Sequence, residues 1–189
     1  VTLNSGTLIS TTGTSSLAGN VAMGASTTIT IDSGAQLTLS GALSGVGFGL
    51  TKAGAGTLVL SGTNTYSGPT TVTSGTLVVS SSANLGDGSA TNNLVFNGGT
   101  LRTDGAFTSP STRGVTMTAA GTINTNGNAL TIGGIITGAG ALTKTGAGDL
   151  TLSNANTFTG TTTVSGGKVV MTHALALQNS SYTTTGSNG

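Results

Sequence analysis

The chain of 189 residues contains no Cys, no Trp and no Glu, and only nine side chains carry a formal charge at neutral pH. Without Cys there is no disulfide, so stability has to come from packing and backbone hydrogen bonds. No segment offers the Ala, Leu, Glu, Lys and Arg mixture of a helical face. The net charge of +1 creates no long-range field, so we expect no nucleic-acid partner. No apolar run approaches the roughly 20 residues of a membrane-spanning helix.

The residues that are abundant favour strands and turns. Thr is the most frequent residue type, Gly occurs 33 times, and 35% of the chain is apolar, which is too much for a disordered segment. Thr and Val pack well on a pleated surface because branching at Cβ restricts their side chains. Gly and Asn supply turns with positive φ. The composition therefore predicts an all-β, turn-rich fold.

A Gly followed closely by a β-favouring apolar residue recurs along the whole chain. The intervals average about 23 residues, and a period of about 20 to 50 residues is the signature of a repeat architecture. Inside each unit the pattern alternates between apolar and polar residues, as strands do. These markers begin at Gly6, Gly34, Gly56, Gly75, Gly99, Gly121, Gly148 and Gly167.

Two all-β architectures could use such a period. A sandwich would pair neighbouring strands through tight hairpins, and its strands would occupy different environments. A β-solenoid stacks equivalent residues in equivalent environments, so like recurs above like. We therefore predict a parallel β-helix of about eight rungs over residues 1–189, a single fragment of a longer protein, because the chain opens inside a strand-like phrase and shows no signal peptide.

One phrase is written twice. Residues 50–79 read LTKAGAGTLVLSGTNTYSGPTTVTSGTLVV and residues 142–171 read LTKTGAGDLTLSNANTFTGTTTVSGGKVVM, with 17 of 30 positions identical and a spacing of about four rungs. Alternation points Thr57, Thr71, Thr151 and Thr163 outward. The residues predicted to point inward are Leu58, Leu60, Val72, Leu77 and Val79, and in the second copy Leu150, Leu152, Val164, Val169 and Met171.

The phrase resembles the autotransporter-associated β-strand repeat, also called the passenger-associated transport repeat. The first copy fits through Leu50, Thr51, Lys52, Gly54, Gly56, Leu58, Leu60, Asn64, Thr65, Tyr66, Gly68, Thr70, Thr71, Val72, Gly75 and Leu77. The second copy fits from Leu142 to Gly167, with Phe158 as the aromatic, and departs at Asn154, Lys168 and Val169.

The resemblance implies a right-handed parallel β-helix in the passenger of a bacterial type V secretion protein. It implies a location outside the cell or on its surface, held to the outer membrane through the protein's own β-barrel, which is the expected partner during export and lies outside this chain. The expected role is a rigid stalk that aids vectorial folding and export, with no enzymatic activity. The alternative is an adhesin or self-associating filament that binds glycans or host surfaces.

The remaining polar and aromatic residues have structural interpretations. We expect Lys52 and Lys144 to cover the edge of the core with their stems while their ammonium groups reach water. Tyr66 and Phe158 are expected to pack at a turn. His173 has no neighbours at ligand spacing. Turn capping is expected of Asp32, Asp87, Asp104 and Asp149. We therefore assign no catalytic, cofactor-binding or metal-binding residue, and no cofactor.

Two further classes fit the fold but not the residues. Glycoside hydrolysis needs a pair of carboxylates about 5 to 10 Å apart, and polysaccharide lyases need a base with clustered acids, whereas this chain has four scattered Asp. An ice-binding solenoid would show registered Thr-x-Thr pairs, which occur at Thr28/Thr30 and Thr116/Thr118 but not once per rung.

Overall fold

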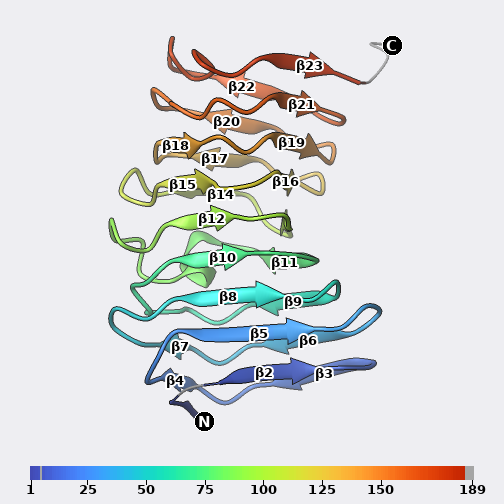
Figure 1. Cartoon of the computed structure of the whole chain (residues 1–189), viewed down its shortest axis with the longest axis vertical. Coiled ribbons are helices and arrows are strands. Elements are labelled where there is room, and N and C mark those ends of the chain that lie inside the picture. Colours follow the sequence, from blue (N-terminus) through green and yellow to red (C-terminus); the bar gives the residue numbers. More distant parts are fainter. Residues whose placement is uncertain (5, 186–189) are drawn as a thin grey trace.

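The chain coils into a β-solenoid in which strands of successive turns pair in parallel (Figure 1). The computed structural model describes residues 1–4 and 6–185. The four final residues, which the prediction included in the coil, lie outside this range. One sheet has nine strands and receives one strand from each turn, so the coil has about nine turns rather than eight. The additional turn is the last, β23 (Tyr182–Thr184), which carries no Gly marker.

Four parallel sheets form the faces of the coil. Sheet A contains β1 (Thr2–Leu3), β4 (Val21–Met23) and β7 (Leu43–Ser44). Sheet B contains β2 (Thr7–Ser10), β5 (Thr27–Ile31), β8 (Leu50–Ala53), β10 (Thr70–Val72), β12 (Leu94–Phe96), β15 (Val115–Met117) and β18 (Ile136–Gly138). Sheet C contains β3 (Thr14–Leu17), β6 (Gln36–Leu39), β9 (Thr57–Leu60), β11 (Thr76–Val79), β13 (Thr100–Thr103), β16 (Gly121–Asn124), β19 (Leu142–Thr145), β21 (Thr162–Val164) and β23. Sheet D contains β14 (Phe107–Ser109), β17 (Leu130–Ile132), β20 (Leu150–Leu152) and β22 (Val169–Met171).

The longest stretch without a strand lies between β11 and β12. Between β11 and β12 the chain forms η1, a 3-10 helix at Ser82–Leu85, and then a loop that reaches Leu94. The turn that contains this stretch is long, since Thr76 pairs with Thr100, whereas in the shorter turn before it Thr57 pairs with Thr76. Within the described residues η1 is the one helical element, as the composition predicted.

Strand register explains why the Gly markers are unevenly spaced. Five consecutive markers, from Gly34 to Gly121, precede or open strands of sheet C. The marker at Gly6 precedes a strand of sheet B, and those at Gly148 and Gly167 precede strands of sheet D. The two longest intervals between markers end at Gly34 and at Gly148. In the first the marker shifts from sheet B to sheet C, and in the second from sheet C to sheet D.

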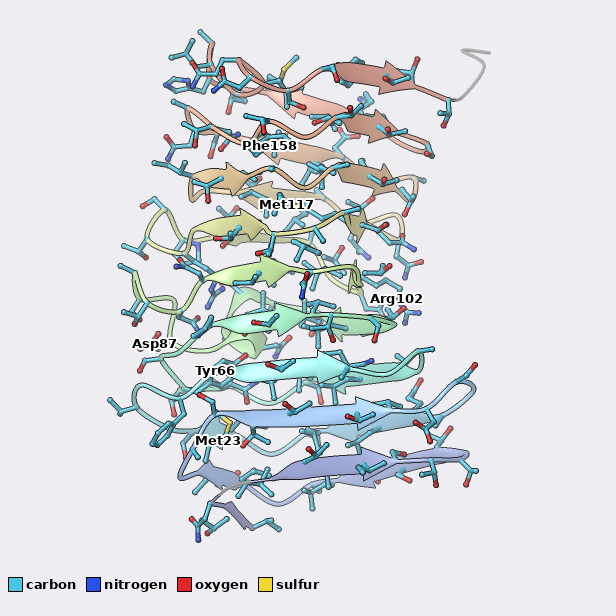
Figure 2. All side chains as sticks on the ribbon, in the orientation of Figure 1. Met23, Tyr66, Asp87, Arg102, Met117 and Phe158 are labelled. Atoms are coloured by element: carbon cyan, nitrogen blue, oxygen red, sulfur yellow. The ribbon has the colours of Figure 1, made fainter. Side chains whose placement is uncertain are left out.

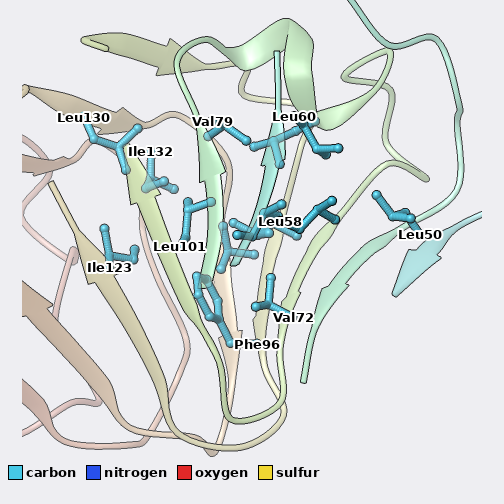
Figure 3. Packing of buried hydrophobic residues seen from close by; sticks show 14 of the residues in the cluster. Leu50, Leu58, Leu60, Val72, Val79, Phe96, Leu101, Ile123, Leu130 and Ile132 are labelled. Atoms are coloured by element: carbon cyan, nitrogen blue, oxygen red, sulfur yellow. The ribbon is translucent and has the colours of Figure 1, made fainter. Parts of the chain in front are cut away.

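Aliphatic side chains stack in columns inside the coil (Figure 3). On sheet C the register runs from Leu37 through Leu58, Leu77 and Leu101 to Ile123. Stacking puts like side chains at the same level of every turn, and one continuous core results. The inward orientation is confirmed for Leu58, Leu60, Val72, Leu77, Val79, Leu150, Leu152 and Val164, which are all buried.

The inward prediction is wrong for Met171, which is 55% exposed. Val169, on the same strand, is half-buried against the core. Both residues lie on β22, the last strand of sheet D, so no further strand of that sheet covers them in the described residues. Alternation fixes which face a side chain takes, but a neighbouring turn is needed to bury it.

Threonines stack on the outside at one position per turn. Each of the outward positions Thr57, Thr71, Thr151 and Thr163 is half-buried, in agreement with the predicted alternation. The sheet C column contains eight Thr and one Gln, in the order Thr14, Gln36, Thr57, Thr76, Thr100, Thr122, Thr143, Thr163 and Thr183. Branched side chains suit a half-buried position on a strand, which accounts for the column.

Replacing Leu60 or the matched Leu152 by Asp should destabilise the chain by several kcal/mol, on the order of 4, because a buried carboxylate would have no cationic partner. Thr151→Asp, at an outward position one residue from Leu152, is the control and should cost far less. Chemical or thermal unfolding followed by circular dichroism measures the difference. Equal unfolding midpoints for Leu152→Asp and Thr151→Asp would contradict the assigned faces.

Candidate functional site

Both lysines of the repeated phrase occupy positions in the core columns. On sheet B, Lys52 lies in register between Ile29 and Val72. On sheet C, Lys144 lies between Ile123 and Val164. Neither lysine exposes any measurable surface. The stems therefore take the place of an aliphatic side chain inside the coil.

Backbone carbonyls surround each ammonium group. Lys52 Nζ donates to the carbonyls of Ala53 (2.8 Å), Gly54 (2.7 Å) and, one turn further on, Ser74 (3.2 Å). Lys144 repeats this with Thr145 and Gly146, both at 2.8 Å, and Gly166 at 3.0 Å. The expectation that the ammonium groups reach water is wrong. The strict alternation that turns Leu50 inward and Thr51 outward also turns the third residue inward, and the following turn bends its carbonyls over the charge.

The turn after each lysine requires glycine. Gly54 has φ 75° and Gly146 has φ 78°, in the left-handed region that other residues avoid. A Cβ at Gly54 would also collide with the backbone of Ile31 in the turn below. The Lys-x-Gly spacing of the phrase is thus one structural unit, in which the glycine lets the backbone fold over the cation.

Burial has an electrostatic cost. It lowers the pKa of Lys52 from 10.5 to about 8. It also lowers the pKa of Lys144, where nearby Asp149 partly opposes the shift. The three carbonyls satisfy the three N–H donors of each ammonium group, so the buried charge is hydrogen-bonded although no carboxylate pairs with it directly.

A buried asparagine in each copy links three successive turns. The side-chain oxygen of Asn64 accepts from Leu43 N (2.8 Å) in the turn below, and its Nδ2 donates to the carbonyl of Asn84 in the turn above. Asn156 does the same with Ile136 N (2.8 Å) and the carbonyl of Ala176 (2.9 Å). The asparagines continue the inter-turn hydrogen bonds where the backbone leaves regular strand geometry.

The aromatic of each copy, two residues after its asparagine, is buried, which agrees with the prediction that it packs at a turn. Tyr66 and Phe158 are 0% and 1% exposed, and Figure 2 places them in the lower and upper parts of the coil. The hydroxyl of Tyr66 hydrogen-bonds to Thr70 Oγ1 at 2.6 Å, and burial raises its pKa to about 12. Neither ring is accessible to stack on a sugar.

The two copies do not lie on the same face. β8 and β10 of the first copy belong to sheet B, whereas their equivalents β19 and β21 belong to sheet C. In the same way β9 and β11 lie on sheet C, and their equivalents β20 and β22 lie on sheet D. The spacing between the copies is therefore four turns plus one face, and equivalent side chains of the two copies point in different directions.

The aspartates and the histidine lie at turns and on the surface. Asp87 accepts a hydrogen bond from Ser89 N (2.9 Å), the predicted turn cap. Asp104 pairs with Arg102 (2.8 Å), which lowers the pKa of its carboxyl, and Asp149 pairs with Lys168 (3.5 Å). Asp32 contributes backbone hydrogen bonds at the turn between β5 and β6. His173 is exposed, and the described residues contain no group of three or more His, Cys, Asp or Glu that could hold a metal.

A third buried cation, Arg113, was not predicted from the sequence. Arg113 is 1% exposed and donates to Asn92 Oδ1 (2.7 and 3.0 Å), Ser82 Oγ (2.8 Å) and the Gly86 carbonyl (3.1 Å). Burial lowers the pKa of its guanidinium. The alternation of the sequence indicates its inward orientation, because Arg113 lies two residues before the inward-pointing Val115. The guanidinium fastens the irregular stretch from η1 to Asn92 onto the coil.

The irregular stretch borders a groove of about 520 Å³. Its lining comes from three successive turns, because the chain departs from the strand path at this point. The residues that line it are Thr63, Asn64, Ser82, Ala83, Gly86, Asp87, Gly88, Thr108, Pro110 and Arg113.

Comparison with known families identifies the repeated phrase. The model of the passenger-associated-transport-repeat family matches residues 50–79 and 142–171, the same boundaries as the two copies. The chain carries two passenger-associated transport repeats. The repeats contain the buried lysines that donate to backbone carbonyls, the asparagines that bridge three turns and the buried aromatics described above.

A curated relative supports the same assignment. The chain is 39% identical over 77 residues to the "Adhesin BmaC autotransporter" of Brucella suis biovar 1 (strain 1330). The matched part is 41% of this chain and 2% of the relative, so this chain corresponds to a very small part of that protein. No solved structure matches the chain significantly. Among the described residues there is no helix with the length and hydrophobicity of a membrane span.

Replacing either bridging asparagine by Ala should destabilise the coil by about 1 to 3 kcal/mol, because an amide in the turn below and a carbonyl in the turn above lose their partner. Asn64→Ala and Asn156→Ala should behave alike. Asn97→Ala, at an exposed asparagine outside both repeats, is the control and should stay near the parent. Denaturant unfolding measures all three. A loss in Asn97→Ala as large as in Asn64→Ala would contradict the bridging role.

The lowered pKa of Lys52 predicts how stability changes at alkaline pH. Between the folded value of about 8 and the ordinary value of 10.5, the unfolded chain binds more protons, so the stability contributed by this position should rise with pH. Below about pH 8 the cost of the buried charge is fully present. The free energy of unfolding of the parent minus that of Lys52→Met, measured from neutral pH up to the ordinary lysine pKa, should therefore increase. A difference that stays flat or decreases contradicts this prediction.

Proposed function

We propose that this chain is a rigid segment of the passenger of a bacterial autotransporter, and that its two repeats help the chain to fold as it is exported. The family of the repeats and the autotransporter relative support this proposal. The expected location is the bacterial surface or the surrounding medium. The partner during export is the outer-membrane barrel of the parent protein.

The observation that carries the proposal is the way each repeat is completed by its neighbouring turns. The ammonium of Lys52 needs the Ser74 carbonyl of the following turn, and Asn64 needs partners both below and above. A turn that has formed therefore exposes polar groups that the next turn satisfies. Such nearest-neighbour coupling lets folding propagate turn by turn and resists its reversal.

The rotation between the copies favours this role over recognition. A site that bound one ligand through both repeats would need equivalent side chains on one face, but the copies differ by one face. The distinctive side chains Lys52, Asn64 and Tyr66 are also buried. A role inside the coil is compatible with any rotation, since the hydrogen bonds run along the axis.

The composition suits passage through a narrow pore. The chain has no Cys that could be locked in a disulfide before export, and its nine charged side chains add little desolvation cost. Folding outside the cell can then make export of the chain unidirectional, because each completed turn opposes sliding of the chain back into the pore. We propose no catalytic role, since Asp32, Asp87, Asp104 and Asp149 lie on different turns.

A second candidate function is adhesion, which the name of the relative favours. In that case exposed loops and strand faces would contact a host surface or another copy of the protein. The buried residues of the repeats would then only support the scaffold.

The test replaces residues 142–171 by a scrambled version of themselves inside the full-length parent protein. Surface display should fall and periplasmic degradation should rise, while insertion of the barrel stays normal. Scrambling residues 94–123, an equally long stretch outside the repeats, is the control and should reduce display less. Normal display combined with loss of binding to host cells would show that the repeat is a recognition element and would overturn the proposal.

A further inference from the structure

The groove beside η1, of about 520 Å³, is broad and open to solvent. The long connection between β11 and β12 carries the chain away from the strand path at this point. The groove is therefore a feature of this particular turn and lies outside the regular strands that the repeats contribute.

Hydrogen bonds from Arg113, in the following turn, hold the walls of the groove in place. Each of the three guanidinium nitrogens of Arg113 donates to an acceptor in the stretch from Ser82 to Asn92. Asn92 also accepts from Gly88 N (3.1 Å) and donates to the Gly68 carbonyl (2.8 Å). Because its N–H groups are used in this way, Arg113 supports the groove and does not bind a ligand itself. A groove fixed before binding loses little entropy when it takes a ligand.

The groups that face the groove are a carboxylate, hydroxyls and a small apolar surface. One oxygen of Asp87 caps the turn at Ser89, and its other oxygen has no partner among the described residues. The hydroxyls of Thr63 and Thr108 likewise make no hydrogen bond within this part of the chain and line the groove. The ring of Pro110 supplies the apolar contact. Figure 2 shows Asp87 at the outer edge of the coil, where a ligand can reach it.

This set of groups matches the chemistry of a sugar that carries no charge. Adjacent sugar hydroxyls can donate to the free carboxylate oxygen of Asp87, and others can exchange hydrogen bonds with Thr63 and Thr108. The C–H face of the ring can pack on Pro110. A negatively charged ligand would be repelled by Asp87, and the fully used donors of Arg113 offer it no compensating hydrogen bond.

We propose that the groove between η1 and β14 is a binding site for a neutral saccharide unit, with Asp87 as the principal hydrogen-bond acceptor. This inference goes beyond the export role and does not depend on it. The isolated chain can bind a sugar whether or not its repeats assist export. With no aromatic platform in the groove, the site should bind weakly and gain strength when many copies are displayed together.

The experiment uses the whole chain on an array of neutral and anionic mono- to tetrasaccharides, followed by titration calorimetry with the neutral sugars that it retains. Asp87→Asn should weaken their binding at least about tenfold, whereas Asp32→Asn, at a turn away from the groove, should leave it unchanged. Thr108→Met should block the groove. Its matched control is Thr131→Met, at the outward position one turn further along sheet D, which should bind like the parent.

Unfolding midpoints of the four variants separate loss of binding from loss of structure. If Asp87→Asn also loses stability, the comparison of Thr108→Met with Thr131→Met decides. Retention of neutral sugars that is sensitive to Asp87→Asn and Thr108→Met alone supports the proposal. Preferential retention of anionic sugars, equal effects of the control variants, or no neutral saccharide bound at millimolar concentration would each overturn it.

Discussion

Parallel hydrogen bonding between successive turns is the interaction on which the rest of the structure depends. It places each residue above its counterpart in the preceding turn, as the pairs Thr57–Thr76 and Thr76–Thr100 illustrate. The aliphatic columns inside and the threonine columns outside both follow from this register. A single turn cannot bury its own apolar face, and Met171 on the last strand of sheet D shows what happens without a covering turn.

The passenger-associated transport repeats reinforce this interaction where it is weakest. Where the chain leaves the strand path, Asn64 and Asn156 replace backbone hydrogen bonds by side-chain ones. Where it turns sharply after a strand, Lys52 and Lys144 donate hydrogen bonds to the carbonyls of the turn. Each repeat extends over more than one turn, because the third carbonyl that accepts from the lysine belongs to the next turn. This carbonyl is that of Ser74 in the first copy and of Gly166 in the second.

Placing the two repeats one face apart has a consequence for how such a coil can be built. Because all the key contacts run along the axis, the unit works on sheets B and C as well as on sheets C and D. The stretch between the copies is then free to vary in length and shape. The irregular turn from η1 to Asn92 is an example of such variation. It forms the groove, and the hydrogen bonds of Arg113 fasten it to the coil.

The sequence by itself determined the fold class, the parallel stacking and the faces of most core residues, because strand alternation and the recurrence of Gly markers about once per turn are local properties that stacking preserves. Alternation also indicates that Lys52 and Arg113 point inward. The sequence predicts a solvated ammonium group for Lys52, because a charged group is usually expected at the surface, and it gives no prediction for Arg113. Only the tertiary structure supplies the carbonyls that make burial of both cations tolerable. The rotation of the second repeat by one face, and the groove at Asp87, depend on how many residues each turn consumes. That length is decided when the turns pack against one another, so neither feature could be predicted from the local pattern.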